Sequence, residues 1–68
     1  MLFYVKANVT LRIQGISGPF IQMVSWLVNA DNHIQAKIKY EEQVRRDFAH
    51  MNFSGISFEY LEVAGEIK

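Results

Sequence analysis

The sequence predicts a single α+β domain, in which a three-stranded antiparallel sheet carries one helix on one face. Its 68 residues suffice for one hydrophobic core and leave no room for a second. Half of them are hydrophobic, which is too many for a chain that stays disordered. Apolar residues recur with period two in three segments and with helical period in one. We therefore expect residues 1–68 to form one ββαβ domain.

The first two predicted elements are strands that form a hairpin. Over residues 3–13 apolar side chains occupy every second position, which is typical of a strand with one face in the core. Residues 15–19 contain two glycines and a proline, and these residue types favour a turn. The second strand is predicted over residues 20–30. Its core face is expected to hold Val24, Trp26, Val28 and Ala30.

A helix is predicted from about His33 to about Ala49. Asn32 and Gln35 have the spacing of a capping box, in which the first side chain accepts a hydrogen bond from a free amide of the first turn. Ile38 lies off the apolar stripe and is expected to be exposed. On a helical projection, an arc of roughly 160° forms the face toward the sheet and holds Ile34, Ala36, Tyr40, Val44, Asp47, Phe48 and Met51.

The third strand is predicted to begin near Ile56, after a connector over residues 51–55 whose Gly55 can end the helical region. Period two holds as far as Tyr60 and then changes phase, because Leu61 and Val63 become the apolar pair. Such a change predicts a β-bulge at residues 60–61, or a strand that leaves the sheet there.

The order of elements predicts the order of strands. Because the third strand runs antiparallel to the first, placing it beside the first gives an all-antiparallel sheet of spatial order 2-1-3. A single helix covers one face of this sheet only. The uncovered face is expected to carry apolar side chains, and such patches usually contact another protein.

We therefore predict a protein interface on the open face or at a strand edge, formed by Tyr4, Ile21, Met23, Leu27, Leu61 and Val63. The alternative is a monomer in which a loop and the termini shield these side chains. Chains of this size rarely gain more than roughly 3–5 kcal/mol from their own core. Since the sequence has no cysteine for a disulfide or a thiolate metal site, a homo-oligomer is the expected source of further stability.

Nucleic-acid binding is the second hypothesis. Lys6 and Arg12 are expected on the open sheet face, and Arg45 and Arg46 on the outer side of the helix. Seven basic residues are balanced by seven acidic ones, so the chain has no net field that attracts nucleic acid or anionic lipid. The balance favours the protein-binding hypothesis.

No catalytic, cofactor or metal site is predicted. His33 and His50 are seventeen residues apart on one helix and cannot share a metal ion. The carboxylates show no sheltered pair, and the serines have no nucleophile context, so we do not expect an enzyme. The N-terminus lacks a signal-peptide pattern, and the longest uncharged stretch is broken by glycine and proline. A cytoplasmic location is expected, consistent with the missing thiols.

Residues 26–44, WLVNADNHIQAKIKYEEQV, resemble a pattern in small uncharacterised bacterial and phage proteins. In these a strand ending in Val-x-Ala leads through a polar cap into a helix with an early alanine. The resemblance covers under a third of the chain, implies the same topology and transfers no functional residues. It implies a phage or mobile-element accessory gene, and under the protein-binding hypothesis a host protein is a further candidate partner.

Overall fold

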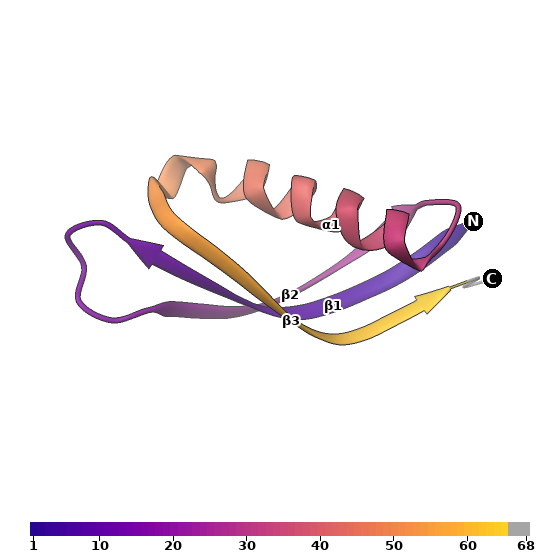
Figure 1. The fold of residues 1–68 in the computed structure, drawn as a ribbon, viewed down its shortest axis with the longest axis horizontal. Helices are drawn as coiled ribbons and strands as arrows, with labels where there is room; N and C mark the ends of the chain where they lie inside the picture. Colours follow the sequence, from indigo (N-terminus) through magenta and orange to yellow (C-terminus); the bar gives the residue numbers. More distant parts are fainter. Residues whose placement is uncertain (66–68) are drawn as a thin grey trace.

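A computed structural model describes residues 1–65 as a three-stranded sheet with one α-helix on one face (Figure 1). The strand order is β2-β1-β3, and both neighbouring pairs are antiparallel. The predicted α+β class and the order 2-1-3 are therefore confirmed. The elements, in chain order, are β1 (Leu2–Ile13), β2 (Phe20–Asn29), α1 (His33–Asp47), a 3₁₀ turn (Ala49–Met51) and β3 (Phe53–Gly65).

The core lies between β1 and α1. Every second residue of β1 is buried, as the alternation predicts, because β1 is the central strand and its covered face lies under the helix. Three helical residues one turn apart complete the centre. The buried side chains of β1 and α1 are Phe3, Val5, Ala7, Val9, Leu11, Ala36, Tyr40 and Val44.

Two predictions for the helix face differ in outcome. Ile38 is exposed, as predicted. Ile34 was expected to face the sheet and is instead 71% exposed. Its position marks the outer limit of the apolar arc, about 80° beyond Val44. Side chains at that limit point past the sheet rather than onto it. Asp47 lies inside the arc and is also exposed, at the last residue of the helix.

The helix begins as predicted and ends slightly earlier. The Asn32 Oδ1 atom accepts a hydrogen bond from the Gln35 amide at 2.9 Å, so the N-cap is as expected. The helix ends at Asp47, and the 3₁₀ turn follows. Asn52, at φ 50°, takes the left-handed conformation that reverses the chain, a role that we had expected of Gly55.

The third strand is longer than predicted and has two irregularities. It begins at Phe53, which pairs with Ile13, so residues 53–55 belong to the strand rather than to a connector. Lys6 pairs with Glu62 and Ala7 with Tyr60, which leaves Leu61 as the extra residue of the predicted bulge. A second shift in register, between Arg12 and Ile13, was not predicted.

The sheet is elongated. The molecule measures 42 × 18 × 16 Å, and in Figure 1 the β1–β2 hairpin extends beyond the helix. Its radius of gyration is 12.7 Å, whereas a compact domain of this length has a radius of about 11 Å. A chain this short therefore encloses its core less completely than an average globular monomer does.

Candidate protein-binding surface

The uncovered face of the sheet has an apolar side at β2. In antiparallel pairs, residues opposite each other lie on the same face, and Ile21, Met23 and Leu27 pair with Thr10, Asn8 and Tyr4. We call Ile21, Met23 and Leu27 the apolar row. Their side chains are 60%, 59% and 58% exposed. No described element covers them, as the prediction of an open apolar face requires.

The remainder of the open face is mostly polar, and the half-buried Tyr4 of the predicted interface lies on it, opposite Leu27. Lys6 of β1 lies opposite Glu62 of β3, and the Asn8 side-chain amide donates to the Glu59 carboxylate at 3.2 Å. One polar pair on the β1–β3 half, Asn8 with Glu59, is therefore hydrogen-bonded within the chain. The apolar row on the β2 half has no such match among residues 1–65.

Two further residues of the predicted interface have different positions. Leu61 is the extra residue of the bulge and is 48% exposed. Val63 pairs with Val5 on the covered face and packs against the buried cluster, so it does not belong to the open face. The bulge causes this difference, because one extra residue exchanges the faces of all residues that follow it.

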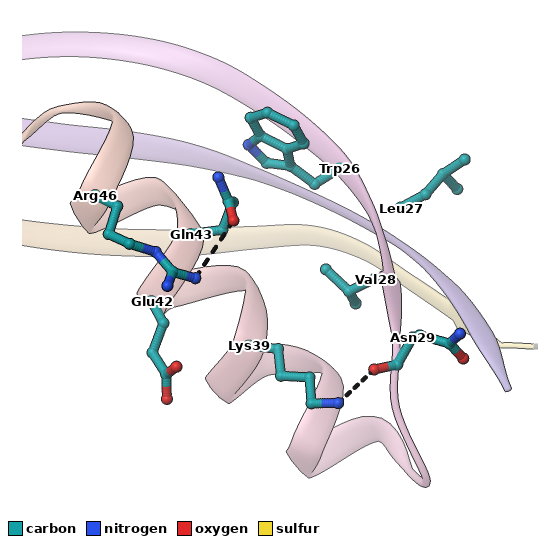
Figure 2. Close-up of a pocket in the computed structure, with 8 residues that line it drawn as sticks. All are labelled: Trp26, Leu27, Val28, Asn29, Lys39, Glu42, Gln43 and Arg46. Carbon is teal, nitrogen blue, oxygen red and sulfur yellow. Dashed lines mark hydrogen bonds between the residues drawn. The ribbon is translucent and has the colours of Figure 1, made fainter.

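A groove of about 500 Å³ runs between β2 and the helix (Figure 2). The Lys39 ammonium donates to the Asn29 carbonyl at 2.7 Å and links the helix to the end of β2. An Arg46 guanidinium nitrogen donates to the Gln43 side-chain oxygen at 3.4 Å. The groove is lined by Trp26, Leu27, Val28, Asn29, Lys39, Glu42, Gln43 and Arg46.

Trp26 is less buried than the sequence indicated. It lies on the covered face, opposite Val5, yet 36% of its surface is exposed. The reason is that β2 is an edge strand, so its covered face has a neighbour on one side only. Sequence reasoning overlooked the helix flank beside Trp26, although the strand order 2-1-3 already made β2 an edge.

Two tyrosine hydroxyls fasten the helix to the two edge strands. The Tyr40 hydroxyl donates to the Val24 carbonyl of β2 at 2.8 Å, and the Tyr60 hydroxyl of β3 donates to the Glu41 carboxylate. Burial, and then the nearby charge of Glu41, raise the pKa of Tyr40 to about 12. Burial also raises the pKa of Tyr60, with further contributions from its hydrogen bond to Glu41 and from that charge. Both hydroxyls are therefore structural hydrogen-bond donors at neutral pH.

The basic residues of the nucleic-acid hypothesis do not form one surface. Lys6 and Arg12 lie on the open face of β1. Arg45 and Arg46 lie on the helix, on the other side of the sheet, and the Arg45 guanidinium sits 6.0 Å from the centre of the Phe58 ring. The structure thus separates the four residues into two pairs.

Within residues 1–65, no three histidine or acidic side chains come together in a way that could hold a metal ion. His33 packs edge-on against the Phe3 ring, with 5.0 Å between ring centres. The one α-helix of the described chain lacks the length and the apolar character that crossing a membrane requires. No family model, curated protein or solved structure matches the chain.

Proposed function

We propose that this chain is a non-enzymatic protein-binding module that self-associates and uses the β2 side of its open sheet face as the binding surface. The observation that carries the proposal is the apolar row. Ile21, Met23 and Leu27 are each more than half exposed on the same face of one strand, with Ser25 between Met23 and Leu27. Contiguous apolar patches on a soluble domain are typical of protein interaction sites.

The free energy gained by burying the apolar row is large for a chain with so small a core. Full burial of one large aliphatic side chain stabilises by about 1.5–3 kcal/mol, so burying the exposed parts of three contributes about 3–5 kcal/mol. A chain of this size gains a net stability of only roughly 3–5 kcal/mol from its own core. Covering the row with protein therefore stabilises the fold by an amount comparable to its entire intrinsic stability.

Charge favours a protein partner over nucleic acid. The chain has seven basic and seven acidic residues, and its four candidate phosphate-binding residues lie on two separate surfaces. Lys6 is additionally opposite Glu62, which reduces the positive potential at that point. A protein surface that matches the uncharged β2 side has no such obstacle.

The test is the molar mass measured by light scattering over a dilution series. We expect the wild-type chain to exceed the 7.9 kDa of one copy at high concentration. Met23→Lys with Leu27→Lys should reduce it to one copy, because each lysine puts a charge in the apolar row. Gln14→Lys with Ser17→Lys adds the same charge in the exposed hairpin loop and should keep the wild-type mass. A wild-type chain that stays at 7.9 kDa up to its solubility limit overturns the proposal.

A further inference from the structure

We infer that two copies of this chain pair along their β2 edges, antiparallel about a two-fold axis at Ser25, to make one continuous six-stranded sheet. The inference rests on the proposed function and makes its self-association specific: the partner is a second copy, the contact is the outer edge of β2, and the apolar rows cover each other only along the flanks that meet at this edge. Edge-to-edge pairing leaves both helices on the same side of the sheet. It also joins the two apolar rows into one surface on the other side.

The β2 edge lacks the features by which proteins block strand addition. Its ten residues include no charged side chain, no proline and no glycine, and its pairing with β1 runs without interruption from Phe20 to Asn29. Natural edge strands are normally protected by charges, proline, bulges or short length. An unprotected edge of ten residues is a ready template for another strand, and an identical uncharged strand meets it without repulsion.

The two-fold axis fixes which residues meet. Antiparallel pairing about Ser25 places Met23 opposite Leu27 of the second copy on the open face, and Val24 opposite its Trp26 on the covered face. Moving the axis to Val24 would place Met23 opposite serine. Moving it to Trp26 would place Leu27 opposite serine. Only the axis at Ser25 pairs all four of these apolar side chains with apolar partners, which is the favourable cross-strand arrangement.

The helices complement each other across this axis. The helix contacts all three strands of its sheet, so its axis lies above β1, and two such helices would stand about 14 Å apart at a strand spacing of about 4.8 Å. Figure 2 shows the groove of one copy, between β2 and the helix, with Trp26 at its β2 side. Edge pairing would bring the two grooves together across the seam. Glu42 and Arg46 are one turn apart on the groove side, so antiparallel helices bring Glu42 of one copy toward Arg46 of the other.

The surface at the β2 edge extends from the strand onto the flank of the helix. A standard interface buries about 800 Å² per partner, which is about a sixth of the 4632 Å² of this molecule. The strand β2 and the four groove-lining residues of the helix make up 14 residues, of which 11 are exposed. These residues make up about a fifth of the described chain.

The test uses the absence of cysteine from the chain. In the paired sheet the two Ser25 Cα atoms would lie about 4.5–5.5 Å apart, within the range of roughly 4.4–6.8 Å that a disulfide spans. Oxidation of Ser25→Cys at a concentration where the chain associates should therefore give a cross-linked dimer in high yield. Ser57→Cys, an exposed serine of β3 on the same face, is the matched control and should not cross-link.

A mixture of two cysteine variants reports the register. Met23→Cys mixed with Leu27→Cys should form the mixed disulfide, whereas Met23→Cys alone should not, because its two copies would be about 14 Å apart along the strands. As a test without oxidation, Ser25→Lys should weaken association at least tenfold, since it places two like charges at the axis. Ser57→Lys should leave the association constant unchanged.

The outcomes separate the two proposals. Wild-type association together with cross-linking at position 25 and none at position 57 supports edge pairing. Wild-type association without cross-linking at position 25, or with equal cross-linking at both positions, overturns edge pairing and leaves the proposed function in place. A chain that stays monomeric at every concentration overturns both.

Discussion

The two edge strands of this sheet differ in how readily they can pair with a further strand. The edge strand β3 has two irregularities in its register with β1 and carries Glu59 and Glu62. The edge strand β2 pairs with β1 without a shift and has no charged residue. Bulges and charges disfavour strand addition, so β3 is protected and β2 is not. Because a single domain contains both kinds of edge, the unprotected one is where we propose that the molecule accepts a partner.

On the covered face, the Tyr40 side chain contacts both edge strands. Tyr40 is fully buried, its hydroxyl donates to Val24 of β2, and its ring lies 5.9 Å and 6.0 Å from the rings of Phe58 and Tyr60 of β3. It therefore packs against one edge and hydrogen-bonds to the other. Tyr40 therefore holds the helix over both edge strands.

The largest predicted effect on stability comes from truncating the Tyr40 side chain. Tyr40→Ala should leave the isolated chain unfolded, because truncating a large buried aromatic costs about 3–5 kcal/mol and the total stability is of the same size. Tyr40→Phe keeps the ring and loses one hydrogen bond, so we expect a cost of about 1 kcal/mol. Urea unfolding followed by circular dichroism measures both. A folded Tyr40→Ala chain with a wild-type midpoint would contradict this role.

The next prediction compares two glycines of β3. A Cβ atom at Gly65 would lie 2.7 Å from the Phe3 ring, which is buried and packed against His33. Gly65→Ala should therefore destabilise by about 1–3 kcal/mol through overpacking. At Gly55 the nearest atom, in the Arg12 side chain, is 3.8 Å away.

Gly55→Ala is the matched control, because it fits without a clash and reduces the backbone freedom of the unfolded chain. We expect no loss of stability and a gain of a few tenths of a kcal/mol at most. Thermal unfolding of Gly65→Ala and Gly55→Ala under the same conditions measures the difference in their stability. Equal melting temperatures would show that the end of β3 is not packed against Phe3 in the way that the contact requires.

The predictability of the two edges from sequence also differs. The strict alternation of β1 and the period-two faces of β2 identified both strands, and the phase change at Tyr60 identified the bulge in β3. The start of β3 was missed, because Ser54 and Gly55 are poor strand formers. Pairing with Arg12 and Ile13 holds them in the sheet, and the Ser54 hydroxyl donates to the Arg12 carbonyl at 3.1 Å. Tertiary contacts of this kind leave no signal in a local pattern.

The candidate surface was predicted in part for a similar reason. The positions of Ile21, Met23 and Leu27 follow from period two alone. The exposure of Trp26 and the groove beside it depend on how far a helix of limited width reaches across the sheet. Val63 was misplaced because the sequence indicated a bulge without showing that the strand continues in the sheet beyond it.

The smallest effect, seen at alkaline pH, concerns the hydroxyls that tie the helix to each edge. Folding raises the pKa of Tyr40 from 10.0 to about 12, so the folded chain retains a proton that the unfolded chain releases. The resulting stability is complete below about pH 10 and is lost as the pH rises from 10 through about 12. The pKa of Tyr60 is raised as well and acts in the same direction.

Replacing each tyrosine in turn tests the hydrogen bond to each edge strand separately. Tyr40→Phe removes the bond to β2 and Tyr60→Phe the bond to β3, so each variant should show a shallower decline in unfolding free energy above pH 10 than the wild type. Urea unfolding at several pH values between 8 and about 12 measures the slopes. If β2 is stabilised by a second copy, the decline in Tyr40→Phe should also depend on protein concentration, because association stabilises the folded chain by mass action. Equal slopes in both variants and the wild type would mean that neither hydroxyl holds its proton in the folded chain.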